Sequence, residues 1–181
     1  MKNIIIRNGI IAGLIVGVPM MAYFLSLSGD SALSDHMMAM TYILMLVALS
    51  MVFVGIKQYR DRVLGGVIGF GPALLVGLGI SAIAGLFYAA AWEICQAFMR
   101  FDFTAFYAKQ IVDQARANGA DERGLAEAAE RATDFTQMYA NPLVRIPMTF
   151  LEIFPVGILV SLVSAALLKN SRFLPARAPA Q

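Results

Sequence analysis

Two glutamates interrupt the most apolar stretches of this sequence. Glu93 is the one charged residue in the run 70–99, and Glu152 is the one charged residue in the run 146–168. A carboxylate at membrane depth is costly and normally faces a cavity or a partner. Two carboxylates at one depth can share a proton, because desolvation and mutual repulsion both disfavour two charges. The two residues therefore suggest a pair that handles protons or cations.

A structural interpretation of the same residues stays open. Each carboxyl group could be protonated, or bonded to a hydroxyl or to Arg100 or Arg145, and serve only to position its helix. Pro155 and Gly157 follow Glu152 closely, and a proline inside a helix removes a backbone hydrogen bond and favours a kink. A kink beside a buried acid could expose carbonyl groups to a ligand, but inert membrane helices also contain kinks.

The composition indicates that transmembrane helices position these residues. Of the 181 residues, 59% are hydrophobic and 14% are charged, and the mean hydropathy is +0.70. Soluble domains have about 45–50% apolar and about 25% charged residues. These values exclude a disordered chain, a nucleic-acid-binding protein and an ordinary cytosolic enzyme.

Four segments are long and apolar enough to cross a membrane. A helix needs about 20 apolar residues to do so, and the segments lie at about 4–27, 37–56, 70–99 and 146–168. We therefore expect an all-α fold: a four-transmembrane-helix bundle that forms one integral membrane domain over residues 1–181. Basic residues gather at the N-terminus, in the segment 57–69 and in the tail 169–181, whereas the loop 28–36 has two acids and no lysine or arginine. Both termini are therefore expected in the cytoplasm.

The segment 100–145 is expected on the outer side as an amphipathic helical hairpin. Phe103, Phe106 and Tyr107 have helical spacing, Asn118-Gly119 is a typical helix stop, and Asp121 can cap a second helix. The hairpin could cover the end of the bundle or dock a partner, and the sequence does not separate these alternatives.

Small residues recur every four positions in two of the spans, which places each set on one helix face. Such faces allow two helix backbones to approach closely, either within one chain or in a homo-oligomer. The series in the third span continues to Glu93, and antiparallel third and fourth spans would place Glu93 and Glu152 at similar depth. The helix-packing residues are Gly9, Gly13 and Gly17 in the first span and Gly77, Ser81 and Gly85 in the third.

Residue types and motifs argue against catalysis. One cysteine and one histidine exclude a disulfide and a zinc site built from these residues. The sequence has no G-x-S-x-G elbow, H-E-x-x-H pair, phosphate-binding loop or Ser-His-Asp set. We therefore expect no enzyme activity, no cofactor, no metal and no nucleic-acid partner. The expected partners are the lipid bilayer and a membrane protein or a second copy of the chain.

Three stretches of the sequence carry a resemblance to a known family. They are Arg7–Leu14, the segment from Gly55 to Asp61 with the glycines that follow, and the run from Tyr139 to Leu143 with Phe150–Gly157. Their order resembles the bacterial membrane family catalogued as domain of unknown function 4199. The resemblance implies a four-span protein of the bacterial inner membrane with an outer helical insertion, and it implies no activity. The signature residues that it carries over are Lys57, Tyr59, Arg60 and Asp61 in the inner loop and Glu152, Pro155 and Gly157 in the fourth span.

These observations lead to two expected functions. The preferred one is an accessory or scaffold subunit, or an interaction subunit, of a membrane assembly. The alternative is a small proton- or cation-coupled transporter that uses Glu93 and Glu152.

Overall fold

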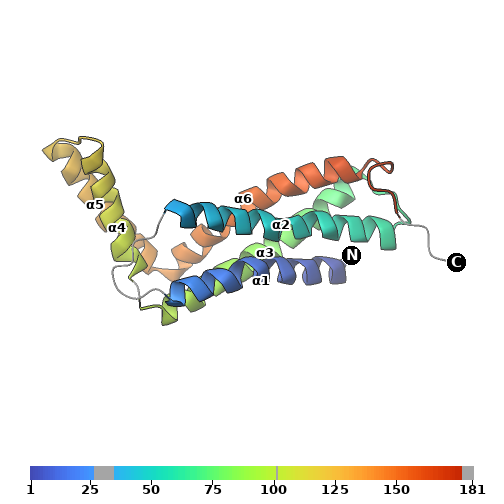
Figure 1. Cartoon of the computed structure of the whole chain (residues 1–181), viewed down its shortest axis with the longest axis horizontal. Helices are drawn as coiled ribbons and strands as arrows, with labels where there is room; N and C mark the ends of the chain where they lie inside the picture. Colours follow the sequence, from blue (N-terminus) through green and yellow to red (C-terminus); the bar gives the residue numbers. More distant parts are fainter. Residues whose placement is uncertain (27–34, 101, 177–181) are drawn as a thin grey trace.

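The computed structural model shows an all-helical chain (Figure 1). It describes residues 1–26, 35–100 and 102–176, with side chains in the second helix described from residue 42. Within these ranges, four helices are long and apolar enough to cross a membrane. The expected all-α class and the four apolar spans are therefore confirmed, while most of the predicted loop 28–36 lies outside the described residues. The described residues form six helices, which are α1 (Lys2–Ser26), α2 (Asp35–Arg62), α3 (Phe70–Phe98), α4 (Phe103–Ala117), α5 (Glu122–Ala140) and α6 (Pro142–Leu168).

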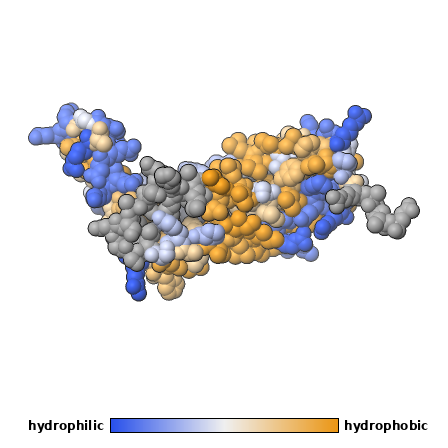
Figure 2. All heavy atoms as spheres, in the orientation of Figure 1, coloured by the Kyte–Doolittle hydropathy of each residue, from blue (hydrophilic) through white to orange (hydrophobic). Residues whose placement is uncertain are grey.

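The four long helices lie side by side, and the α4–α5 pair projects from one end of them (Figure 1). The chain starts at the opposite end, where the described tail after α6 also lies; we call this the terminal end, and the other the α4–α5 end. Apolar residues dominate the surface between the two ends, and hydrophilic residues gather at both (Figure 2). This distribution is the one expected for helices that cross a hydrocarbon layer.

Two helix boundaries differ from the expected ones. The fourth apolar helix begins at Pro142 instead of near residue 146, because the Asn141 side chain accepts a hydrogen bond from the Leu143 amide (3.0 Å) and proline is favoured in the first helical turn. The second extends to Arg62 instead of ending near residue 56. Its last turn contains Arg60 and Arg62, and cations there are favoured by the helix dipole. The inner-loop signature is therefore helical.

The contact between α3 and α6 depends on small residues that face one another. A Cβ atom built on Gly77 would lie 2.8 Å from Ser161 Cβ, and one built on Gly157 would lie 2.6 Å from Ser81 Cβ. The two serine hydroxyls lie 3.3 Å apart at the centre of this contact. Nearer the α4–α5 end, Gly85 lies against Phe150 and Ile153. The two helices are thus antiparallel and approach one another at the level of their backbones.

The glycines of α1 pack against a different face of α3. Gly9 lies against Ile83 and Gly17 against Ala91, and Gly13 lies between them against Phe87. Larger side chains of α3 therefore fill the space that the α1 glycines leave open. Each small-residue series contacts a neighbouring helix of the same chain.

The α4–α5 pair is held by its own caps and aromatic contacts. Asp102 accepts from the Ala105 amide (2.9 Å), and Asp121 accepts from the Gly124 amide (2.8 Å). Such caps satisfy amide groups that lack partners within the helix. Tyr107 of α4 and Phe135 of α5 have ring centroids 4.7 Å apart.

Replacing Gly157 by alanine tests the close α3–α6 contact. The added methyl group would collide with Ser81 Cβ, which cannot rotate away, so we expect a loss of about 1–3 kcal/mol in the free energy of unfolding in detergent. Gly71→Ala is the matched control, because nothing lies within 4 Å of its added Cβ, and it should be neutral or slightly stabilising. Equal stability of the two variants would contradict the packing described here.

Candidate functional site

Glu93 forms a two-point ion pair with Arg145 near the α4–α5 end. Arg145 Nε donates to Glu93 Oε1 (2.7 Å), and the adjacent terminal nitrogen donates to Oε2 (2.6 Å). The Arg145 and Glu93 side chains are 15% and 24% exposed. Parallel bonds of this kind are among the strongest charge-assisted hydrogen bonds in proteins. The negative charge of Glu93 is therefore balanced by Arg145 of α6 in the same chain.

The same arginine connects the end of α5 to α3. Arg145 also donates to the Tyr139 carbonyl oxygen (3.2 Å), and its guanidinium lies 5.7 Å from the centroid of the Tyr139 ring. The Tyr139 hydroxyl accepts from Trp92 Nε1 (2.7 Å). Burial raises the pKa of Tyr139 to about 12, against the opposing effect of the Trp92 hydrogen bond. The Tyr139 hydroxyl is therefore protonated at neutral pH, and this network holds α5 against α3.

Glu152 lies in a different environment. Its Oε2 atom accepts a hydrogen bond from the Tyr88 hydroxyl (3.2 Å), and the residue as a whole is exposed on α6. Leu151 beside it is 60% exposed and Leu159, about two turns further along the helix, is 62% exposed. Tyr88, by contrast, is buried. Glu152 thus lies on the exposed side of α6, and its carboxylate reaches the hydroxyl of the buried Tyr88 on α3.

The register of α3 and α6 separates the two glutamates. The contacts of Gly77 with Ser161, Ser81 with Gly157 and Gly85 with Ile153 follow one antiparallel register. In that register Glu93 lies level with Arg145, and Glu152 lies seven residues nearer the terminal end, which is about 10 Å along a helix axis.

The similar depth expected for the two glutamates is therefore wrong. Among the described residues no hydrogen bond joins Glu93 and Glu152, and each carboxylate has its own partner. In the part of the chain that the structure describes, no three His, Cys, Asp or Glu side chains lie close enough together to hold a metal ion.

Pro155 adds an acceptor to the region around Glu152. Helix α6 continues through Pro155 to Leu168, but proline has no N–H to donate to the carbonyl oxygen four residues earlier. That carbonyl belongs to Leu151, next to Glu152. Pro155 is exposed, while Gly157 is buried against Ser81. The exposed side of α6 therefore contains Pro155, and its buried side provides the close packing against α3.

The inner-loop signature at the terminal end contains a fully buried arginine. Arg60 is 0% exposed. Its Nε donates to Asp61 Oδ1 (2.7 Å), one terminal nitrogen donates to the Phe173 carbonyl (2.9 Å), and the other donates to the Leu174 carbonyl. Arg60 thus clamps the tail that follows α6 onto the end of α2. The sequence predicted only that Arg60 belongs to a basic inner loop, and it did not predict that the side chain is buried.

The other signature residues surround Arg60. Lys57 forms an ion pair with Asp61 one helical turn away, so both oxygens of Asp61 are bound to cations. Tyr59 is partly buried against the core, and its carbonyl oxygen accepts from the Val63 amide (3.1 Å) where α2 ends. These residues hold α2, its terminal turn and the tail in one arrangement.

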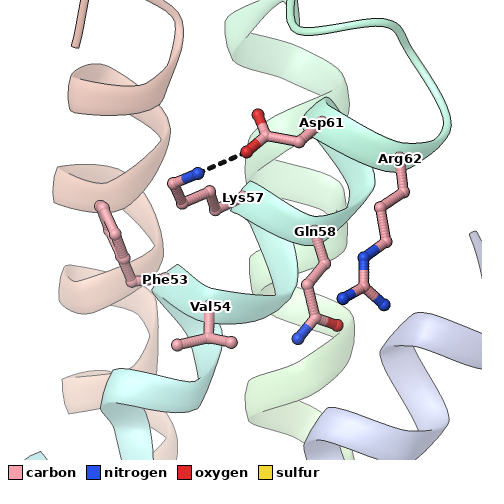
Figure 3. Close-up of a pocket in the computed structure, with 6 residues that line it drawn as sticks. All are labelled: Phe53, Val54, Lys57, Gln58, Asp61 and Arg62. Atoms are coloured by element: carbon pink, nitrogen blue, oxygen red, sulfur yellow. Dashed lines mark hydrogen bonds and ion pairs between the residues drawn. The ribbon is translucent and has the colours of Figure 1, made fainter. Parts of the chain in front are cut away.

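A groove opens on α2 beside Lys57 and Asp61. It encloses about 210 Å³ and is lined by Phe53, Val54, Lys57, Gln58, Asp61 and Arg62. Figure 3 shows Lys57 reaching toward Asp61 on one side of the helix, with the Gln58 amide and the Arg62 guanidinium on the other. The two apolar residues lie on the side of the groove away from the terminal turn. Lys57 and Asp61 belong to the signature residues predicted from the sequence, whereas Gln58 and Arg62 were not predicted as site residues.

Removing one member of the Glu93–Arg145 pair should destabilise the protein strongly. Arg145→Gln leaves a partly buried carboxylate without its cation, and we expect a loss of about 3 kcal/mol or more in the free energy of unfolding. The double variant Glu93→Gln/Arg145→Gln should lose less than the sum of the two single variants. Additive losses, measured by denaturation in detergent, would show that the two side chains do not interact.

Replacing Arg60 by lysine should release the tail. Lysine keeps the charge but lacks the planar set of donors that reaches both tail carbonyls. Hydrogen exchange measured by mass spectrometry should become at least severalfold faster in residues 169–176, whereas Arg62→Lys should leave it unchanged. Unchanged exchange in Arg60→Lys would mean that the tail is held by other contacts.

Comparison with known proteins supports the resemblance seen in the sequence. No curated protein and no solved structure matches the chain. The family model described as "Protein of unknown function (DUF4199)" matches residues 7–170. This match covers the three stretches that carried the resemblance, and it confirms that assignment. The chain therefore belongs to the DUF4199 family of proteins of unknown function.

Proposed function

We propose that this protein is an accessory or scaffold subunit that packs beside another membrane protein in a bacterial inner membrane. The observation that carries the proposal is the exposed position of Glu152 on the apolar outer face of α6. We assign the protein no catalytic activity, cofactor or metal.

Glu152 needs a partner if α6 spans a bilayer. It lies 16 residues from the end of α6 at Leu168, which is about 24 Å along the helix and falls within a hydrocarbon layer of about 30 Å. A charged residue that faces lipid is unfavourable throughout this layer, and the cost reaches about 2.5–3.5 kcal/mol or more at the layer centre. One hydrogen bond from Tyr88 offsets only part of this cost. A neighbouring transmembrane helix with a donor or a cation at that depth would offset the rest.

The Leu151 carbonyl strengthens the argument for a donor on the partner. Pro155 removes its usual donor, so Glu152 and this carbonyl place two acceptors close together on one face. Interhelical hydrogen bonds and small or polar contacts are what join helices in lipid, where the hydrophobic effect is absent. The partner is therefore a membrane helix that carries a hydrogen-bond donor, either in another protein or in a second copy of this chain.

The proposal includes a topology. The four long helices form a transmembrane bundle with both termini in the cytoplasm, and the α4–α5 pair is an extracytoplasmic helical hairpin. The basic residues at the terminal end and the acidic loop 28–36 support this orientation. The hairpin extends beyond the long helices (Figure 1), so it offers a second surface for the partner.

The transporter alternative required Glu93 and Glu152 to work as a pair. Arg145 binds both oxygens of Glu93, and the register of α3 and α6 places Glu152 about 10 Å away along the axis. The geometry therefore favours the accessory subunit over a carrier built on two shared acids.

Site-specific photo-crosslinking in native membranes tests the proposed interface. A photoreactive residue at Leu151 lies beside Glu152, and one at Leu86 lies at the same level on α3; both positions are 60% exposed. We expect a protein adduct of defined mass at Leu151, formed at least severalfold more strongly than at Leu86. Glu152→Leu should weaken that adduct without loss of folding, because it removes the acceptor that the partner binds.

Two results would overturn the proposal. One is adduct formation that is equally weak at Leu151 and Leu86, which indicates lipid on both faces. The other is a monodisperse monomer after native purification in mild detergent, without any co-purifying membrane protein.

A further inference from the structure

We propose that the groove on α2 at the terminal end binds the phosphate-bearing headgroup of an anionic phospholipid. The inference requires only that the long helices span a membrane, and it does not depend on an accessory role. It rests on the charges, donors and apolar surface that meet in the groove (Figure 3).

The groove has more positive than negative charge. Its charged lining residues are Lys57, Asp61 and Arg62. Asp61 is bound by Lys57 and by the buried Arg60. Arg62 is exposed, and its side chain makes no hydrogen bond or ion pair with any residue that the structure describes. Its guanidinium therefore keeps all five N–H donors available for an anion. The Lys57 ammonium, which has Asp61 as its partner, keeps two of its three N–H donors available.

Gln58 supplies a further donor whose orientation is set by α1. Its side-chain oxygen accepts from Arg7 (2.6 Å) and from Asn8 (3.2 Å). Because the oxygen is occupied by these two donors, the amide nitrogen is left to face the groove, on the Val54 side in Figure 3. The arrangement also brings the Arg7 cation next to the groove. Lysine, arginine and amide donors together are the groups that bind phosphate oxygens.

The apolar side of the groove indicates a lipid and not a free ion. Phe53 and Val54 line it below the polar groups. Val47 and Ile43 follow Val54 at helical spacing toward the α4–α5 end, and they are 51% and 61% exposed. An acyl chain can lie along this strip while its headgroup meets Lys57 and Arg62. A soluble phosphate would contact only the polar part.

A second hollow extends the groove on its polar side. It encloses about 530 Å³ and shares Lys57, Asp61 and Arg62 with the first, and the tail residues Leu174–Ala176 complete it. Arg60 holds that tail in place through the Phe173 and Leu174 carbonyls. The headgroup site is therefore built from α2 and a clamped tail. Lys169 and Arg172 lie at the same end but do not line either hollow.

Native mass spectrometry of the full chain in detergent, titrated with phosphatidylglycerol and separately with phosphatidylcholine, tests this inference. We expect the wild-type protein to retain phosphatidylglycerol preferentially. Arg62→Gln should weaken that binding about fivefold, since each basic residue near an anionic lipid contributes about 1 kcal/mol. Lys169→Gln removes the same charge at the same end of the molecule, and it should weaken binding less than twofold.

Two further measurements separate a lipid site from its alternatives. Millimolar inorganic phosphate should leave phosphatidylglycerol bound, and a photoreactive phosphatidylglycerol should label the wild-type peptide that contains Phe53 and Val54. Displacement of the lipid by phosphate would assign the site to a soluble anion and overturn the inference. Equal effects of Arg62→Gln and Lys169→Gln would also overturn it. They would show that the lipid is attracted by the overall positive charge of the terminal end and not by the groove. Labelling spread evenly over all four long helices would do the same.

Discussion

The close approach of α3 and α6 is the constraint on which the rest of the structure depends. Gly77 faces Ser161 and Gly157 faces Ser81, so neither helix can slide along the other without driving a side chain into a backbone. This register places Glu93 level with Arg145, where the ion pair forms. It also places Glu152 about 10 Å nearer the terminal end, level with Leu86 of α3. The relative positions of the two acids therefore follow from contacts between small residues that carry no charge.

Charges inside the molecule are balanced by ion pairs and carbonyl groups within the chain. Arg145 neutralises Glu93 between α3 and α6, and Arg60 is compensated by Asp61 and by the carbonyl groups of the tail. Both arrangements also connect elements: the first joins the α4–α5 pair to the long helices, and the second closes the terminal end. The charged side chains of Glu152 and Arg62 have no oppositely charged partner among the described residues. We expect binding at the surfaces that contain them, which are the exposed side of α6 and the groove on α2.

Local features of the sequence predicted much of the fold. The apolar runs predicted four long helices, the Asn118-Gly119 stop predicted where α4 ends, and the capping residue Asp121 predicted where α5 begins. These features act within a few residues of the chain, so they can be recognised without a structure. The extension of α2 to Arg62 was missed, because charged residues after an apolar run can continue a helix beyond the hydrocarbon layer as well as end it. The expected common depth of the two glutamates failed because it assumed a register that the sequence does not specify.

By itself, the sequence determined the four long apolar helices, the helical nature of α4, the capped start of α5 and the existence of small-residue faces. Only the tertiary structure decided which faces meet: the α1 glycines pack on Ile83 and Phe87, and the α3 series packs on α6. It also decided that Arg60 is buried against the tail, a contact between residues 113 positions apart, and that Glu152 bonds to Tyr88 and not to Glu93 or a cation. The physical reason is that hydropathy and capping act along one helix, whereas burial and ion pairing depend on side chains that distant segments bring to the same depth.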